Sequence, residues 1–139
     1  MYLKKGSAIL LALIISTSLF ANRINRKHSP KNLNEAIMQL DKVYSDKNKR
    51  EIYDMTESEY TTESRFSIGL WVRYHWGLSQ GNKLSKYFNE LGIYHPNDMS
   101  AIIIHCYYRH LHHQDFELNK LIRYYQERRK ALLKPEVKK

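Results

Sequence analysis

Apolar side chains recur every three or four positions along most of the chain after residue 31. In the stretch "NLNEAIMQLDKVY" these positions are Leu33, Ala36, Ile37, Leu40, Val43 and Tyr44. Because an α-helix turns once in 3.6 residues, this spacing predicts an amphipathic helix. Asn32 and Glu35 have the spacing of a capping box, which places the start of that helix directly after Asn32.

The same pattern continues through the middle of the chain. Ser45 can cap a short second helix in "SDKNKREIYDM", and Thr56 with Glu59 repeats the capping-box spacing. The longer stretch that follows, "ESEYTTESRFSIGLWVRYHWGL", has helical periodicity, although its centre "SIGLWV" also resembles a strand. We favour a helix there, because no second strand exists to pair with it.

The last third of the chain has clear helix boundaries. "KLSKYFNELG" predicts a helix that stops at Gly92, and Pro96 suits the first position of the next helix. A final helix with Asp115 as its cap would end at Pro135. We therefore expect an all-α fold, a single small domain of about five helices over residues 32–134.

The two ends of the chain are predicted to lie outside that domain. Residues 1–21 carry Lys4 and Lys5 ahead of an apolar run, which is the layout of a signal peptide. The run is shorter than the roughly 20 apolar residues that span a bilayer, so we expect cleavage; an uncleaved leader would instead anchor the protein to the membrane. Residues 22–31 read as a flexible segment and 135–139 as a tail.

Charge and export together narrow the choice of partners. Without the leader lysines, 21 basic and 14 acidic residues remain, a net charge of +7. In the periplasm of a bacterium, or outside the cell, such a protein meets an envelope protein or an anionic surface rather than nucleic acid. The basic segment after residue 116 reads as a solvated face, with contact to anionic lipid as the alternative. Cys106 is the single cysteine, so no internal disulfide can form.

The segment "GIYHPNDMS" has two interpretations. In the first, Gly92 ends one helix, Pro96 begins the next, and Asp98 lies in the first turn, near the positive end of the helix dipole. In the second, His95 is a general base that Asp98 orients, with Ser100 as a candidate nucleophile. We favour the helix corner, because it accounts for the whole segment and local consistency is the default explanation. A serine in a first helical turn also bonds to backbone more often than it acts as a nucleophile.

Two further groups of residues could bind a ligand. Trp71, Arg73 and Trp76 would suit a sugar or an anion, although two tryptophans in a small domain are more often core residues. Arg73 is the member expected to act elsewhere, by bridging to Asp98. The histidines around Cys106 match no zinc signature, so we expect no metal and no cofactor.

Two motifs in this chain resemble those of an uncharacterised bacterial family described as a domain of unknown function. They are "GLWVRYHWGL" and "KYFNELGIYHPNDMS", preceded by a helix like "NLNEAIMQLDKVY". The resemblance covers about residues 30–112 and implies no activity. Family members often have asparagines where this chain has Tyr74 and His75, so a ligand read by those positions would differ here.

These observations support two hypotheses about function. The first is an exported, non-enzymatic binding module that recognises an envelope partner or an anionic ligand through residues Trp71, Arg73, Trp76, His95 and Asp98. The second is a small hydrolase or sugar-processing enzyme that uses His95 and Asp98. We favour the first, because no complete catalytic set is present in the sequence.

Overall fold

A computed structural model describes residues 29–134 of the chain. The predicted signal peptide, most of the predicted flexible segment and the tail lie outside the described residues. The described part contains seven α-helices and no strand: α2 (Leu33–Val43), α3 (Asp46–Asp54), α4 (Glu57–Ser64), α5 (Ile68–His75), α6 (Lys83–Glu90), α7 (Pro96–Leu111) and α8 (Leu118–Leu133). The all-α prediction is confirmed, and the count of about five helices is wrong.

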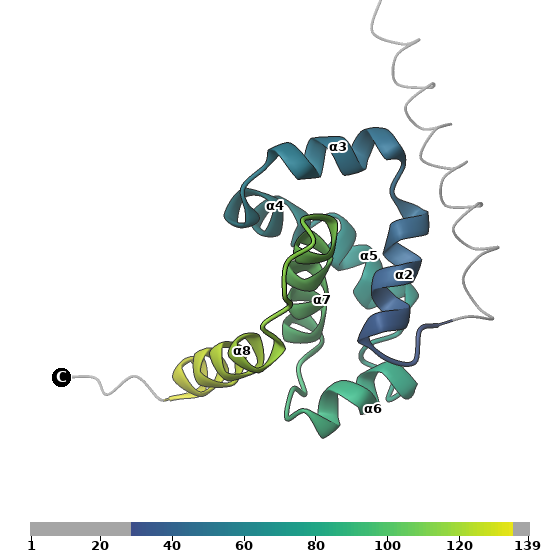
Figure 1. Cartoon of the computed structure of the whole chain (residues 1–139). Coiled ribbons are helices and arrows are strands. Elements are labelled where there is room, and N and C mark those ends of the chain that lie inside the picture. The colour runs from purple at the N-terminus through teal and green to yellow at the C-terminus, as the bar shows by residue number, and fades with distance from the viewer. Residues whose placement is uncertain (1–28, 135–139) are drawn as a thin grey trace, which may run out of the picture.

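Helix α7 is the centre of the domain (Figure 1) and contacts every other described helix. The sequence explains this position, since α7 is apolar around most of its circumference. Its fully buried side chains include Met99, Ile102, Ile103, Cys106 and Tyr107. A helix that is apolar on nearly all sides must be covered on nearly all sides, and the shorter helices provide that cover.

Three predicted helix starts are confirmed. The side chains of Asn32, Ser45 and Thr56 each accept a hydrogen bond from the backbone N–H three residues later. At Thr56 the capping box is complete, because the Glu59 carboxylate accepts from the Thr56 backbone N–H at 2.8 Å. The Glu35 carboxylate instead accepts from the backbone N–H of Lys31 at 2.8 Å.

The extra helices come from two places. The short helix α3 forms, and the long stretch predicted as one helix is broken between α4 and α5 at Arg65, Phe66 and Ser67. At the break, the Ser67 hydroxyl donates to the backbone oxygen of Glu63 at 3.2 Å, which competes with helix continuation. The turn lets α5 bury Val72 against α7 while Phe66 stays exposed.

The corner between α6 and α7 forms as the favoured interpretation predicts. Gly92 has a φ of +77°, the left-handed conformation that ends a helix, and Pro96 is the first residue of α7. His95 is the N-cap residue, and its Nδ1 accepts from the backbone N–H of Asn97 at 3.1 Å. The segment "GIYHPND" is therefore a helix-to-helix corner.

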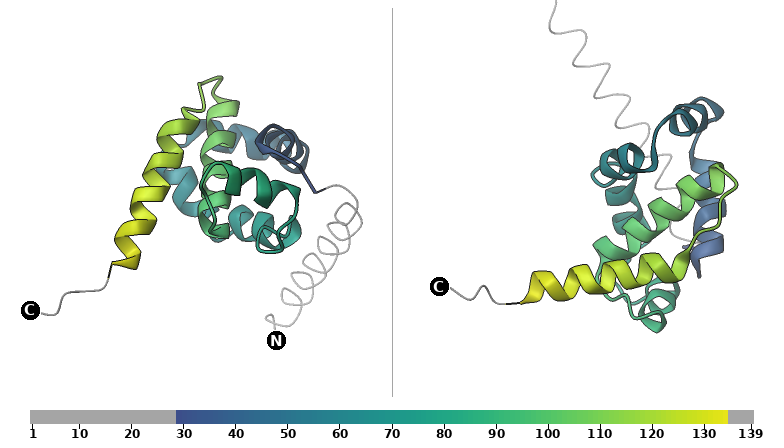
Figure 2. Two further views of the ribbon diagram at one scale, coloured as in Figure 1. Left: turned by 90° about the horizontal axis from the view of Figure 1, so that it is seen from below. Right: turned by 60° about the vertical axis from the view of Figure 1, so that its left-hand side comes forward.

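The last helix begins later than predicted. Helix α8 starts at Leu118, and its N-cap residue is Glu117 in a left-handed conformation. Asp115 does not cap the helix, because its carboxylate accepts from the Glu117 backbone N–H at 2.6 Å and so closes the preceding turn. Leu121, Ile122 and Tyr125 are buried, whereas the last turns extend past the other helices (Figure 2).

The folded part also begins slightly before residue 32, since Pro30 is fully buried. Within residues 29–134, no helix combines the length and the apolar character that crossing a bilayer would need.

Candidate functional site

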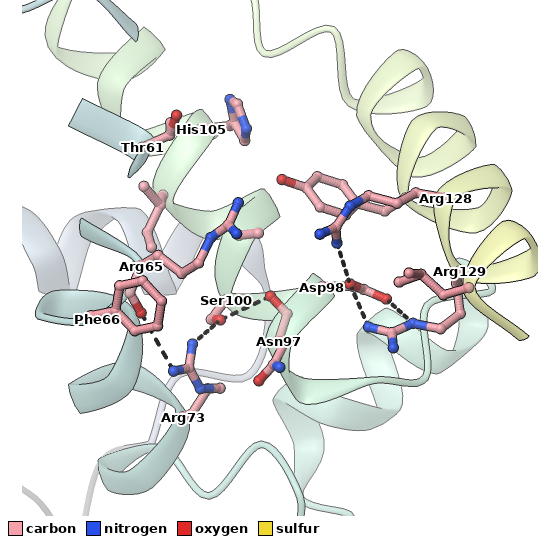
Figure 3. Close-up of a pocket in the computed structure, with 14 residues that line it drawn as sticks. Thr61, Arg65, Phe66, Arg73, Asn97, Asp98, Ser100, His105, Arg128 and Arg129 are labelled. Atoms are coloured by element: carbon pink, nitrogen blue, oxygen red, sulfur yellow. Dashed lines mark hydrogen bonds and ion pairs between the residues drawn. The ribbon is translucent and has the colours of Figure 1, made fainter. Parts of the chain in front are cut away.

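A pocket of about 220 Å³ lies where α4, α5, α7 and α8 meet. In Figure 3, the end of α4 together with α5 forms one wall, α7 forms the floor, and α8 forms the opposite wall. The charged and polar lining residues are Thr61, Arg65, Arg73, Asn97, Asp98, Ser100, His105, Tyr125, Arg128 and Arg129. The apolar lining residues are Phe66, Ala101, Ile104 and Leu132.

Four arginines and one aspartate determine the charge of this pocket. Arg65 and Arg73 come from the α4–α5 wall, and Arg128 and Arg129 come from α8. The guanidinium groups of Arg65 and Arg128 reach in from opposite walls (Figure 3). With Asp98 as the single lining carboxylate, the lining residues have a formal charge of +3 when His105 is neutral.

Asp98 is neutralised by the last helix. Arg129 donates to both carboxylate oxygens, from Nε at 2.9 Å and from Nη2 at 2.8 Å, and Arg128 lies 4.0 Å away. The Asp98 side chain is only 5% exposed, and its hydrogen bonds raise the pKa of Arg129. The predicted bridge from Arg73 to Asp98 is wrong, because Arg129 on α8 donates to both oxygens of that carboxylate.

Arg73 instead contacts neutral oxygens. Its Nη1 donates to the Ser100 hydroxyl at 2.9 Å and its Nη2 to the backbone oxygen of Arg65 at 3.4 Å. Burial lowers the pKa of Arg73, as expected for a cation that has lost water. Among the described residues, no carboxylate lies within 4.0 Å of the guanidinium of Arg65 or Arg73. The α4–α5 wall therefore presents two positive charges that form no ion pair with any of the residues 29–134.

The catalytic candidates lie close in sequence but serve separate roles. The His95 side chain is exposed and caps α7, whereas Asp98 is buried in its ion pair with Arg129. The Ser100 hydroxyl donates to the backbone oxygen of Asn97 at 3.0 Å and accepts from Arg73. In the part of the chain that the structure describes, these hydrogen bonds do not link His95, Asp98 and Ser100 into a catalytic chain.

The two tryptophans do not line this pocket. Trp76 is 1% exposed and belongs to the core, where its ring meets that of Trp71 edge-on with centroids 5.8 Å apart. Trp71 is partly buried and stacks on His75 at 4.6 Å. Of the five predicted ligand-binding residues, the structure places Arg73 and Asp98 in the pocket and leaves Trp71, Trp76 and His95 outside it.

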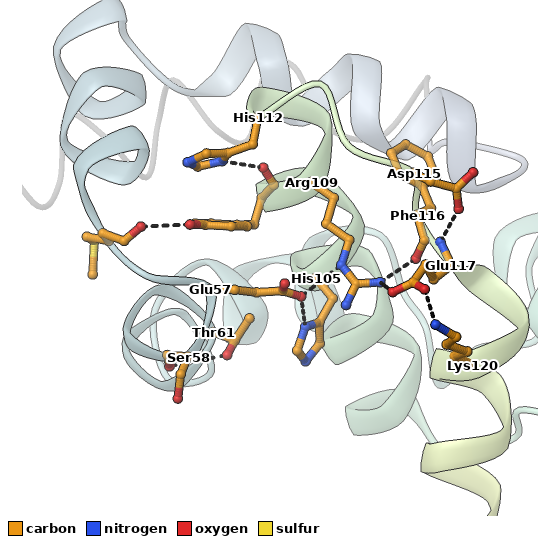
Figure 4. A network of polar contacts seen from close by, with 12 residues as sticks. Glu57, Ser58, Thr61, His105, Arg109, His112, Asp115, Phe116, Glu117 and Lys120 are labelled. Carbon is orange, nitrogen blue, oxygen red and sulfur yellow. Dashed lines mark hydrogen bonds and ion pairs between the residues drawn. The ribbon is translucent and has the colours of Figure 1, made fainter.

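A second polar cluster joins α4, α7 and the turn before α8 (Figure 4). The Glu57 carboxylate contacts His105 Nδ1 at 2.7 Å and accepts from Arg109 Nε at 3.0 Å. Arg109 also donates to the backbone oxygen of Phe116 at 2.6 Å. Since each of its charges has a partner, this cluster reads as a structural link.

The remaining histidines do not converge on Cys106. Within residues 29–134, no three His, Cys, Asp or Glu side chains are placed to hold a metal ion. Burial raises the pKa of the Cys106 thiol to about 12, which disfavours the thiolate that a metal would need. His112 is held by backbone oxygens of Tyr53 and Tyr108.

Sequence reasoning missed Arg65, Arg128 and Arg129 as members of one site. A signal for Arg129 was present, because it lies four residues after Tyr125, a residue of the buried stripe of α8. Residues four apart lie on one helical face, so Arg129 had to face inward. Nothing local distinguishes Arg65, which follows the last residue of α4.

The family described as a domain of unknown function (DUF6794) matches residues 29–111. The chain belongs to DUF6794. The matched residues contain α2 to α7, and so they include Arg65, Arg73 and Asp98, whereas Arg128 and Arg129 lie beyond them on α8. No match to a curated protein and no match to a solved structure was found. The resemblance to an uncharacterised family is thus confirmed.

Proposed function

We propose that this DUF6794 protein is a binding module whose four-arginine pocket takes an anionic group. The observation that carries the proposal is the pair Arg65 and Arg73, whose guanidinium groups line the pocket without a carboxylate within 4.0 Å among the described residues. Arg65 is exposed, whereas Arg73 is partly buried, and a positive charge that is partly removed from water gains most from an anion placed beside it. Burial lowers the pKa of Arg73, as expected for a guanidinium that has lost water and has no ion pair to compensate.

The chemistry of the arginine side chain indicates which anions fit. A guanidinium offers planar pairs of N–H donors that match the two oxygens of a phosphate or a carboxylate. Arg65 and Arg128 approach from opposite walls, so a single anionic group between them can accept from both. Arg129 is already engaged by Asp98 and holds the α8 wall in place.

This use of the pocket needs no catalysis. His95, the residue proposed as a general base, serves as a helix cap, and Asp98 serves in an ion pair. The geometry thus supports recognition of an anion more strongly than hydrolysis.

Isothermal titration with inorganic phosphate, sulfate and acetate at constant ionic strength tests the proposal. We expect wild type to bind phosphate, and the double variant Arg65→Gln/Arg128→Gln to bind it about tenfold more weakly. This variant leaves the Asp98–Arg129 pair and the Arg73–Ser100 bond intact.

The matched control is Arg50→Gln/Arg123→Gln. It removes the same charge from two exposed positions outside the pocket and should leave phosphate affinity unchanged. Equal losses in both double variants would mean that net charge alone attracts the anion. Absence of phosphate, sulfate and acetate binding by wild type would refute the proposal.

Export remains part of the proposal. The signal-peptide pattern of residues 1–21 and the net charge of +7 without the leader lysines favour a place in the bacterial envelope, where anionic partners are abundant. Fractionation of cells that make the full chain should find the protein in the periplasm or medium, at a mass lower than that of the full chain. Recovery of full-length protein from the cytoplasm would contradict this.

A further inference from the structure

Two large apolar side chains lie in opposite walls of the pocket and are mostly uncovered. Phe66, on the α4–α5 side, is 79% exposed, and Leu132, on α8, is 60% exposed. Isolated exposed apolar residues are common on protein surfaces and need no explanation. Here both line the same pocket as the unpaired arginines, so the site combines positive charge with uncovered apolar surface.

The position of Leu132 follows from the course of α8. Leu132 lies seven residues after Tyr125, two turns further along the same helical face. Tyr125 is buried against the domain, but α8 then extends past the other helices (Figure 2). The face that is buried near the start of α8 therefore continues, uncovered, over the pocket.

The size of the pocket limits what can enter it. Its volume of about 220 Å³ lies below the roughly 300–1,000 Å³ of typical small-molecule sites. It can hold a charged head group but not the body of a larger ligand. The remainder of a larger ligand must lie over the rim of the pocket, where Phe66 and Leu132 are exposed.

We propose that the ligand is an anionic amphiphile, with its phosphate-type head group in the arginine pocket and its hydrocarbon chain against Phe66 and Leu132. This inference rests on the proposed anion-binding function and adds the class of ligand to it. The chain would remain partly open to solvent, because the two side chains contact it only from the pocket rim.

The end of α8 favours a lipid-like ligand over an acidic peptide. Leu132 and Leu133 are both largely exposed, and Arg128, Lys130 and Lys134 lie within five residues of them, whereas Arg129 is paired with Asp98. Exposed leucines beside several cations are typical of helices that contact anionic lipid.

A chain-length series tests the inference on the protein without its leader. We compare inorganic phosphate, ethyl phosphate and hexyl phosphate by isothermal titration at constant ionic strength. Each fully buried methylene raises the affinity roughly fourfold. A methylene that is covered on one side only gains about half of that free energy, which corresponds to about a twofold rise in affinity. Hexyl phosphate should therefore bind about 16-fold more tightly than ethyl phosphate.

Two double variants locate the effect. Phe66→Ser/Leu132→Ser should lower the affinity for hexyl phosphate to that for ethyl phosphate. The affinity for inorganic phosphate should be the same as in wild type. Leu70→Ser/Tyr74→Ser removes two residues that are 55% and 81% exposed but lie outside the pocket lining, and should keep the full chain-length effect. Equal losses in the two double variants would overturn the assignment to Phe66 and Leu132.

The outcomes separate this inference from the function on which it rests. If phosphate binds but hexyl phosphate binds no more tightly than ethyl phosphate, the amphiphile is refuted and the anion pocket stands. If none of the three binds, both proposals fail. A phosphoserine peptide with polar flanks provides one more test. The amphiphile proposal would be overturned if this peptide bound more tightly than hexyl phosphate and bound equally well to wild type and to Phe66→Ser/Leu132→Ser.

Vesicles distinguish the two sources of such a ligand. Co-sedimentation with phosphatidylglycerol vesicles but not phosphatidylcholine vesicles, lost in Phe66→Ser/Leu132→Ser, would support a headgroup held in a membrane. Binding of hexyl phosphate without vesicle binding would support a free amphiphile.

Discussion

Replacement of Arg129 by alanine should destabilise the domain strongly, because it leaves a buried carboxylate without its partner. Arg129 makes two hydrogen bonds to Asp98, at 2.9 and 2.8 Å, and the Asp98 side chain is 5% exposed. The pair joins the first turn of α7 to the fourth turn of α8. Without Arg129, the buried Asp98 carboxylate loses both of these hydrogen bonds, and little remains to offset the free energy of removing its charge from water.

The size of the loss can be worked out from the structure. Removal of one partner of a buried ion pair typically costs 3–5 kcal/mol. Here Arg129 is 29% exposed and Arg128 remains 4.0 Å from Asp98, and both facts reduce the cost. We expect a loss of about 2–3 kcal/mol, which for a domain of this size lowers the Tm by roughly 8–12 °C.

Urea unfolding followed by circular dichroism measures this loss. Arg128→Ala is the matched control: it removes the same charge from the neighbouring position, and we expect it to cost less than about 1 kcal/mol. Adding Asp98→Asn to Arg129→Ala should recover part of the stability, because the buried charge is then gone. A loss in Arg129→Ala no larger than in Arg128→Ala, or no recovery in the double variant, would refute the reasoning.

Three further predictions concern the rest of the domain. Glu57→Ala should cost about 2 kcal/mol in chemical denaturation, because Arg109, whose side chain is only 14% exposed, loses its nearer carboxylate and keeps only Glu117, at 3.7 Å; an unchanged free energy of unfolding would contradict this. Gly69→Ala should lower the stability of the domain, although alanine usually stabilises a helix interior by about 1 kcal/mol. The added Cβ would lie 2.9 Å from Ile104 Cδ1 and 3.0 Å from the Ser64 backbone oxygen, which cannot rotate away; a stabilised variant would show that α5 can move. Burial raises the pKa of Cys106 to about 12, so at pH 8 its thiol should react with a thiol reagent about a thousandfold more slowly in the folded protein than in urea; equal labelling rates would count against its burial. The free energy of unfolding should also fall as the pH rises above about 8.5, because there the thiol ionises only in the unfolded chain.

Helix starts and stops were predictable because their signals are local. The caps at Asn32, Ser45 and Thr56 and the stop at Gly92 depend on residues within three or four positions. The break between α4 and α5 was not predictable, because it depends on how closely α5 approaches α7. At Gly69 an added Cβ would lie 2.9 Å from Cδ1 of Ile104 on α7, a contact that appears only after folding.

The candidate site was predictable only in part. Sequence reasoning singled out Arg73, Asp98 and Ser100, and all three line the pocket. The partner of Asp98 was missed, because Arg129 is 31 residues away and reaches it only through the direction that α8 takes after its turn. Periodicity shows which face of a helix is buried, but not which neighbour that face meets.

The most direct test of the anion pocket is to observe the arginine side chains during a phosphate titration. Two-dimensional NMR of the Nε–Hε groups in ¹⁵N-labelled protein reports each guanidinium separately. We predict that the signals of Arg65, Arg73 and Arg128 shift together with one dissociation constant, while that of Arg123, exposed on α8 outside the pocket, stays in place. Shifts of Arg123 as large as those of the other three, or no shifts in any of them, would contradict the account.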